Sequence, residues 1–567
     1  MNPLALSPQL RQQSIDRLAS GSELDLLVIG GGVVGSGCAL DAVTRGLSTG
    51  LVEKRDFASG TSSRSSKLIH GGLRYLEMLD FGLVREALQE RGLLLTRLAP
   101  HLVRPVPFLY PLTKAVVERP YVEAGLTLYD TMARGLGTAA GLPWHRHLSR
   151  RQALRIAPAL KRSALKGAVL YYDAKVDDAR HTMEVARTAA SYGAHVATRV
   201  AAVGFLRQGE RVTGIRAVDQ VSGRAFEVPA RQVVNATGVW TDETQAMVGE
   251  RGQFHVRASK GIHLVVPRDR IHSTSGIILR TATSVLFVIP WGRHWIIGTT
   301  DTDWNLDKAH PAATSADIAY LLDNVNTVLT TRLTQADVEG VYAGLRPLLA
   351  GESDVTSKLS REHIVTHPTP GLVVVAGGKY TTYRVMAKDA IDEAARALGG
   401  DVPPSVTDDI PLVGAVGYHA LWNRRRALAV ESGLHVERIE KMLMRHGVLI
   451  TEILDLVAVD PTLGEPMPGG EDYLKAEIVY AASHEGALHL DDILARRTRL
   501  SIETWDRAVG ASGAAGELVA PILGWDEGTI AEEVEHYRQR VEAERVSQTL
   551  PDDASADAAR LLAPDRG

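Results

Sequence analysis

Hydrophobic and polar positions change their spacing several times along this chain. Residues 25–30, DLLVIG, form a short apolar run typical of a buried strand, and a glycine-rich turn and a helical pattern follow it. A second run, LSTGLVEK at 47–54, comes next. This order of strand, turn, helix and strand predicts the start of a parallel α/β domain, with Gly46 ending the helix in a left-handed conformation.

Further along the chain, segments with strand-like alternation predict a second sheet. They are KGIHLVVP at 260–267 and VLFVIPWGRHWIIGTTD at 285–301, and the latter predicts a hairpin that turns near Gly292. A helical pattern runs from about Asp80 to Leu98. GLVVVAGG predicts a buried strand leading into a helix that begins near Thr382, and beyond the prolines at 403, 404 and 411 the pattern is helical.

Composition and charge exclude several classes of protein. At 567 residues, with 45% apolar and 23% charged residues, the chain is too long for one ordinary domain and has globular proportions. A net charge of −4 gives no global positive field for nucleic acid. The single Cys38 forms no intrachain disulfide and no cysteine metal centre, and no run reaches the ~20 apolar residues of a spanning helix. We therefore expect a cytoplasmic protein that meets a membrane, if at all, at its surface.

The turn after the first strand carries the spacing G-x-G-x-x-G. Gly30, Gly32 and Gly35 allow a tight turn, a close approach of backbone to a pyrophosphate, and close packing of helix on strand. The start of the helix then presents unpaired N–H groups to the phosphates. Glu53, at the end of the second strand, stands where a carboxylate binds the ribose hydroxyls of an adenine dinucleotide.

The glycine spacing alone does not distinguish NAD from FAD. After Glu53 the chain leaves the βαβ pattern for a polar run at 56–77, DFASGTSSRSSKLIHGGLRYLE. Its hydroxyls and backbone N–H groups suit a pyrophosphate or a flavin, and a solvated loop is the alternative interpretation.

Several motifs together resemble a known family. In chain order they are GGGVVGSG, TSSRSSKLIHGGLRYLE, VVNATGVW, KGIHLVVP, FVIPW, IIGTTD, AGLRPL, SREH, GGKYTTYR and DDILARRTRL. They resemble the FAD-dependent glycerol-3-phosphate dehydrogenases, from about residue 22 to about residue 540. The resemblance implies oxidation of sn-glycerol 3-phosphate to dihydroxyacetone phosphate, with hydride transfer from C2 to flavin N5 and electrons passed to a membrane quinone.

The same resemblance assigns site residues at matching motif positions. It implies catalytic His263, Arg74 and Lys379, and substrate-binding Tyr75, Arg346 and Arg361. It implies FAD contacts from Gly30, Gly31, Gly32, Gly35, Glu53, Thr61, Ser62, Ser66, Ala236, Thr237, Gly238, Gly377, Gly378, Thr381 and Thr382. Arg64 departs from the small residue that we expect at its position. The chain has no calcium-binding D-x-D-x-D-G loop, and we expect no metal.

The residue chemistry agrees with this assignment. Arg346 lies in the apolar run AGLRPLLAG and needs an anionic partner, so with Arg361 it forms our predicted phosphate clamp. His263 is the predicted base for the substrate hydroxyl, and a core histidine is the alternative. Arg74 and Lys379 suit the flavin N1–C2=O region, where the reduced ring gathers negative charge.

The fold we expect is a multidomain α/β and α+β chain. It combines a Rossmann-like FAD-binding domain, an antiparallel-sheet substrate domain and an all-helical C-terminal domain. The expected divisions are an arm at 1–22, the FAD-binding domain at 23–400 with substrate segments at 100–170 and 240–350, the helical domain at 401–545, and a polar tail at 546–567.

Other functions also fit these residues. One is an oxidase that passes electrons to oxygen and makes hydrogen peroxide; others are an amine or amino-acid oxidase and a non-catalytic nucleotide-binding protein. The arginines at 424–426, 496, 497 and 499 suit either an anionic lipid surface or a solvated helix face. Trp291 and Trp295 suit either a membrane interface or packing under the hairpin. A homodimer and peripheral contact with the inner face of the cell membrane also stay open.

Overall fold

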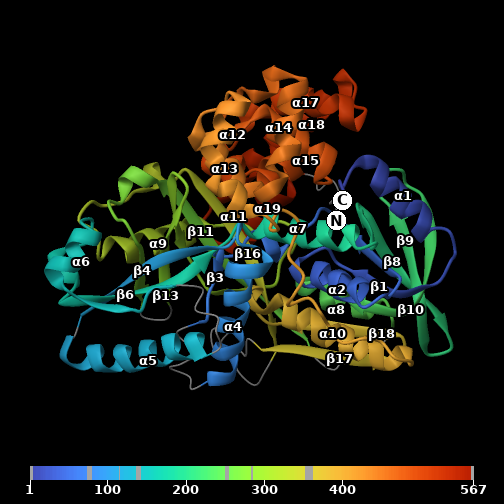
Figure 1. Ribbon diagram of the computed structural model, residues 1–567, viewed down its shortest axis with the longest axis horizontal. Coiled ribbons are helices and arrows are strands. Elements are labelled where there is room, and N and C mark those ends of the chain that lie inside the picture. Colours follow the sequence, from blue (N-terminus) through green and yellow to red (C-terminus); the bar gives the residue numbers. More distant parts are fainter. Residues whose placement is uncertain are drawn as a thin grey trace.

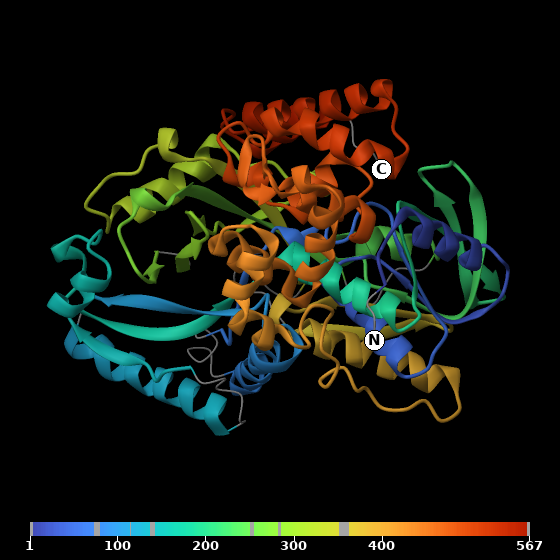
Figure 2. The ribbon, with the colours of Figure 1, turned by 45° about the horizontal axis from the view of Figure 1, so that its top comes forward.

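The computed structural model describes residues 4–72, 80–113, 115–135, 142–249, 255–281, 285–350 and 362–563. Two sheets lie side by side, and the C-terminal helices, orange to red, pack across the region where the sheets meet (Figures 1 and 2). Helix α7 (Asp178–Ser191) lies at this junction and contacts both the nucleotide-binding side and the C-terminal helices.

The first sheet is the predicted Rossmann-like core. Its strand order is β17-β18-β10-β1-β2-β7, and all neighbours pair in parallel except β17. The continuous apolar runs are explained by helices on both faces, since such strands are buried on each side. The strands are β1 (Leu24–Ile29), β2 (Thr49–Glu53), β7 (His195–Thr198), β10 (Ala225–Asn235), β17 (His363–Thr369) and β18 (Leu372–Gly377), with the ribbon β8 (Val200–Gln208) and β9 (Arg211–Asp219) attached to β10.

Helix α2 follows β1 directly and packs between two other helices, α7 and α10. The chain before the sheet is also ordered: α1 packs on β7, and its Ile15 and Leu18 are buried. The helices of this part are α1 (Pro8–Leu18), α2 (Val33–Thr44), α7, α8 (Thr241–Ala246) and α10 (Tyr383–Leu398).

The second sheet is antiparallel except where β12 pairs with β4, as expected for the substrate domain. The predicted hairpin is confirmed, with Gly292 between two of its strands at a φ of 51°. The strands are β3 (Leu68–Ile69), β4 (Arg104–Leu112), β5 (Arg146–Ser149), β6 (Gly167–Lys175), β11 (Val256–Pro267), β12 (Gly276–Arg280), β13 (Val285–Trp291), β14 (His294–Gly298), β15 (Thr302–Trp304) and β16 (Gly340–Leu349). The helices around it are α4 (Phe81–Leu93), α5 (Ala115–Gly135), α6 (Arg150–Ile156) and α9 (Ser315–Asn326).

The C-terminal part is helical but also holds a small two-stranded ribbon. Its helices are α11 (Tyr418–Asn423), α12 (Arg425–Ser432), α13 (Val436–His446), α14 (Ile450–Val459), α15 (Lys475–His484), α16 (Leu500–Glu503), α17 (Val509–Leu523), α18 (Glu527–Ser547) and α19 (Asp553–Leu561). The ribbon is β19 (Pro466–Met467) with β20 (Gly470–Leu474), and a π-helical segment, η11, spans Asp492–Arg497. Within the predicted polar tail, Asp553–Leu561 thus forms a packed helix, whose Asp553 pairs with Lys260 of β11.

The tryptophans of the hairpin face the protein. Trp295 is fully buried, and its indole N–H donates to the carbonyls of Arg268 and Ile271, both at 3.1 Å. Trp291 donates to Glu503 Oε1 at 2.6 Å. Packing under the hairpin, and not insertion into a membrane, is therefore the role of this pair.

For the arginines at 496, 497 and 499, both interpretations, an anionic lipid surface and a solvated helix face, were wrong. Arg496, Arg497 and Arg499 are 2–6% exposed and are ion-paired with buried aspartates, including Asp56 and Asp178. They belong to an internal network, because a buried charge is tolerated only with its partner. Within the described ranges, no helix combines the length and the apolar character needed to cross a bilayer.

Candidate active site

A cavity of about 750 Å³ lies at the carboxyl ends of β1, β10 and β18 and extends to the second sheet. This is the edge at which open parallel sheets bind nucleotides. Residues of both sheets line it. Among the predicted site residues these are Gly30, Gly32, Glu53, Thr61, Ser62, Ser66, Ala236, Thr237, Gly238, His263, Arg346, Gly377, Gly378, Lys379 and Thr381.

The glycine turn has room for backbone only. Gly30 has a φ of 111°, and a Cβ there would lie 2.7 Å from the Ala236 carbonyl oxygen. A Cβ on Gly35 would lie 1.9 Å from the Gly30 carbonyl oxygen, so this position serves helix-on-strand packing outside the cavity wall. Gly32 caps α2, and the Val33 N–H donates to Ser62 Oγ at 3.0 Å. The turn therefore fits a pyrophosphate at a helix N-terminus.

Glu53 is held by backbone at the end of β2. Its carboxylate accepts from the Gly31 N–H at 2.6 Å and from the Arg55 N–H at 2.7 Å. Burial raises the pKa of Glu53, and these two hydrogen bonds oppose that rise. Gly31 does not line the cavity, and its contribution is the hydrogen bond that its N–H donates to this carboxylate. A partly buried carboxylate on the wall, fixed but with lone pairs left, fits the ribose hydroxyls of the adenosine half of FAD.

Replacing Glu53 with glutamine is expected to weaken FAD binding by about tenfold, because one charge-assisted acceptor is lost and an NH₂ group faces the Gly31 N–H. Titration of the apoprotein with FAD measures this. Asp25 pairs with Ser48 at the far end of the first sheet, so Asp25→Asn is the control. An unchanged FAD dissociation constant in Glu53→Gln would contradict the assignment.

His263 projects from β11 into the cavity. Its Nε2 lies 2.8 Å from Ser66 Oγ, and its ring stacks on that of Tyr342 with centroids 4.7 Å apart. Tyr342 is the cross-strand neighbour of His263 on β16. On the other side, a Cβ at Gly298 would lie 2.2 Å from the imidazole, so glycine there makes room for the ring. The side chain is therefore fixed on three sides.

The imidazole of His263 is neutral at physiological pH. Burial, together with the charges of Arg346 and Lys67, holds its pKa well below the usual value of 6.5. Its Nδ1 is buried and has no hydrogen-bond partner among the described residues. A neutral imidazole with an unused ring nitrogen has the capacity to exchange a proton with a bound ligand.

Arg346 is fixed on β16 beside His263. Its guanidinium donates to Thr299 Oγ1 at 3.0 Å and to the Thr300 carbonyl at 3.1 Å, and it lies 3.6 Å from Asp301. The expected anionic partner therefore includes a carboxylate of the chain itself. Since the same side chain lines the cavity, its orientation is set before any phosphate arrives.

The turn after β18 forms the third wall. Gly377 and Gly378 have φ values of 77° and 75°, and Lys379 follows them on the wall. Thr381 Oγ1 accepts from the His70 N–H at 3.2 Å, which ties this turn to the chain that follows the serine-rich loop. Thr382 is buried immediately before α10 and is not on the wall.

Three of the predicted residues lie outside the described residues: Arg74, Tyr75 and Arg361. Their roles stay predictions.

Arg64, which stands where the sequence led us to expect a small residue, lines the cavity and donates to the Ala309 carbonyl at 3.0 Å. Burial, with the nearby Arg540 and Arg560, lowers its pKa to about 9.

Sequence reasoning missed the residues that hold the serine-rich loop in place. Ser66, predicted as a cofactor contact, is hydrogen-bonded to His263. Lys67 and Asp178 are fully buried and form an ion pair beside this loop. The available signal was a lysine, Lys67, directly before the apolar residues Leu68 and Ile69.

The fold and the cavity define an FAD-dependent oxidoreductase. Residues 25–384 match the family described as "FAD dependent oxidoreductase", and residues 405–530 match the "C-terminal domain of alpha-glycerophosphate oxidase". The cradle at Gly30, the carboxylate of Glu53 and the size of the cavity all fit FAD as the cofactor.

Comparisons with individual proteins show to which group of FAD-dependent oxidoreductases the chain belongs. The chain is 60% identical over 561 residues to "Glycerol-3-phosphate dehydrogenase 2" of Mycobacterium tuberculosis, covering 99% of this chain and 95% of the relative. It is 37% identical to the mitochondrial glycerol-3-phosphate dehydrogenase of Homo sapiens, covering 95% and 76%. The structure of glycerol-3-phosphate dehydrogenase from Bacillus halodurans complexed with FAD matches at a TM-score of 0.77 and 27% identity, covering 95% and 98%. The chain belongs to the family of FAD-dependent glycerol-3-phosphate dehydrogenases.

Proposed function

We propose that this enzyme oxidises sn-glycerol 3-phosphate at C2 to dihydroxyacetone phosphate and passes the two electrons to a quinone. The observation that carries the proposal is the placement of neutral His263 beside the fixed cation Arg346 in one cavity with the glycine cradle. A secondary alcohol next to a phosphate requires this combination, a proton acceptor near C2 and a cation for the phosphate.

The oxidation removes a proton from the C2 hydroxyl and a hydride from C2, leaving the carbonyl. FAD, when bound, supplies the hydride acceptor. His263 takes the hydroxyl proton, since its imidazole is neutral and Ser66 and Tyr342 hold its ring in place. We propose that Arg346 orients the phosphate and that Lys379, on the cavity wall, is a cation beside the flavin. We propose Arg361 as the second phosphate ligand, Tyr75 as a substrate contact and Arg74 as a further cation near the flavin.

Glycerol 3-phosphate, added without oxygen, is expected to bleach the yellow flavin absorbance of the purified protein completely, whereas glycerol leaves it unchanged. The reason is that glycerol lacks the phosphate group that Arg346 is proposed to bind. Anaerobic absorbance titration checks this. Equal bleaching of the flavin by an amino acid would instead favour an amino-acid oxidase.

The alternative acceptor is molecular oxygen. Residues 405–530 match a domain named after an oxidase, which favours this possibility, whereas the full-length relatives named above are called dehydrogenases. Comparing the yield of hydrogen peroxide with the reduction of a soluble quinone analogue decides between them. A stoichiometric peroxide yield that the quinone analogue does not suppress would overturn the quinone proposal.

Transfer to a quinone brings the enzyme to a membrane surface, because quinones partition into the bilayer. We therefore propose peripheral binding to the inner face of the cell membrane. Flotation of the holoenzyme with vesicles containing anionic lipid and quinone tests it. We also propose a homodimer, because two-fold symmetric dimers are the commonest oligomers of soluble proteins, and the mass of the enzyme in solution tests this proposal.

A further inference from the structure

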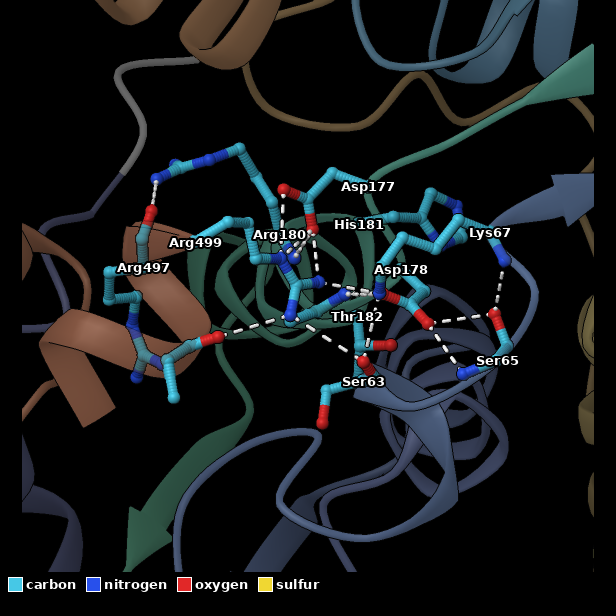
Figure 3. Close-up of polar contacts among 12 residues, drawn as sticks. Ser63, Ser65, Lys67, Asp177, Asp178, Arg180, His181, Thr182, Arg497 and Arg499 are labelled. Atoms are coloured by element: carbon cyan, nitrogen blue, oxygen red, sulfur yellow. Dashed lines mark hydrogen bonds and ion pairs between the residues drawn. The ribbon is translucent and has the colours of Figure 1, made fainter. Parts of the chain in front are cut away.

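The loop that carries Ser66 is held by a buried carboxylate on another element. Asp178, at the start of α7, is fully buried, and its Oδ2 accepts from the Ser65 N–H at 2.9 Å and from Ser65 Oγ at 2.7 Å. Its Oδ1 accepts from Lys67 Nζ at 2.7 Å. The residues on either side of Ser66 are therefore both anchored to one side chain (Figure 3).

The C-terminal helices complete this anchor. Arg499, next to the π-helical segment η11, donates from Nη2 to Asp178 Oδ1 at 2.6 Å, and it also pairs with the neighbouring Asp177 (Figure 3). Arg499 is 3% exposed. The carboxylate of Asp178 thus lies between a cation of the loop and a cation of the C-terminal part, as a buried charge requires.

Displacement of the loop would disturb two contacts of His263. Ser66 Oγ lies 2.8 Å from the imidazole Nε2. Tyr342 donates from its hydroxyl to the Ser65 carbonyl at 3.0 Å, and the same ring stacks on His263. A shift at Ser65 therefore disturbs both a hydrogen bond and the stacking partner of the imidazole.

We propose that Asp178 is a positioning residue for His263, acting through Ser65, Ser66 and Lys67, and that Arg499 makes the C-terminal helices part of this support. The proposal rests on the proposed role of His263. Asp178 itself does not line the cavity, so it acts only through the loop. Since an error of about 1 Å in a reacting group costs on the order of 10²-fold in rate, such a support has a measurable effect on kcat.

The decisive variant is Asp178→Asn with Asp177→Asn as its matched control. All the hydrogen-bond partners of the Asp178 carboxylate are donors. In asparagine the NH₂ group is also a donor, so it would face at least one of these donors and lose that hydrogen bond. Asp177 also pairs with Arg499 and caps α7, but it has no hydrogen bond to the loop, and asparagine caps a helix equally well.

Hydrogen exchange of the holoenzyme is the first measurement, because it does not depend on turnover. In Asp178→Asn the amides of residues 61–69 are expected to exchange about tenfold faster or more, and in Asp177→Asn to stay within about twofold of wild type. Equal protection of this segment in both variants, or equal loss in both, would overturn the proposal. If glycerol 3-phosphate fails to bleach the wild-type flavin, the proposed function fails, and exchange alone still decides how the loop is held.

Steady-state kinetics are the second measurement. Asp178→Asn is expected to lower kcat by about tenfold to a hundredfold, with a smaller change in KM, while Asp177→Asn retains kcat within about twofold. In a His263→Asn background the Asp178 change is expected to cost less than about threefold, since coupled residues are not additive. Full multiplication of the two losses would mean that Asp178 does not act through His263.

A milder variant covers the case in which Asp178→Asn does not fold. Ser65→Ala leaves the Asp178 ion pairs intact and removes only the hydroxyl contacts to Asp178 and to the Lys67 N–H. It is expected to lower kcat by about threefold to tenfold with unchanged FAD content. Unchanged kcat together with unchanged exchange of residues 61–69 would overturn the proposal.

Discussion

Replacing His263 with asparagine is expected to lower kcat by about 10²- to 10⁴-fold, the range that a positioned general base contributes. Asparagine keeps a polar side chain of similar length but does not take up a proton at this pH. Because Ser66 and Tyr342 hold the imidazole in place within the protein itself, we expect the FAD content and the flavin spectrum to be unchanged. Anaerobic stopped-flow measurement of flavin reduction by glycerol 3-phosphate isolates the affected step.

The pH dependence identifies the same group. Burial, Arg346 and Lys67 hold the pKa of His263 well below 6.5, so the protonated form appears only at acid pH. The rate of flavin reduction should therefore stay level as pH falls through 6.5 and decline only below it, and the variant should lose this decline. The control is His272, an exposed residue after the second sheet's β11, whose substitution by asparagine should leave both rate and profile unchanged. Undiminished flavin reduction in His263→Asn would remove the base assignment.

Replacing Arg346 with alanine is expected to lower kcat/KM by about 10²- to 10³-fold, mainly through KM. Charge-assisted hydrogen bonds to a phosphate are the strong ones, and loss of the cation also removes the countercharge of nearby Asp301, which makes the site more negative. Both effects oppose binding of the same group. Steady-state kinetics with glycerol 3-phosphate, and equilibrium binding of a non-reacting phosphate analogue, measure the loss.

The conservative variant Arg346→Lys separates charge from geometry. Lysine supplies the charge but not the fork that donates to Thr299 and Thr300, so it should restore only part of the loss. Arg332, exposed at 77% of its side-chain surface, is the control, and its alanine variant should behave as wild type. Unchanged affinity for glycerol 3-phosphate in Arg346→Ala would show that the phosphate binds elsewhere.

Much of the fold follows from local patterns. The run from Asp25 to Gly35 combines a buried strand, a turn that only glycine fits and a helix start, and each of these acts within a few residues. The hairpin at Gly292 and the helix after Thr382 are local in the same sense. The packed helix α19 was missed, because apart from Leu561 it has only small or charged side chains and its burial depends on distant partners such as Lys260.

The sequence by itself determined the nucleotide cradle, the carboxylate at Glu53 and the residue types of the site, because these depend on short spacing and on side-chain chemistry. Only the tertiary structure decided that Ser66 faces His263, 197 positions away, and that Arg499 faces Asp178 across 321 positions. The tertiary structure also showed that Arg496, Arg497 and Arg499, which suited a surface by sequence, are buried. The physical reason is that a buried charge or ring nitrogen takes its partner from whichever element folding brings beside it, and local spacing along the chain carries no record of that neighbour.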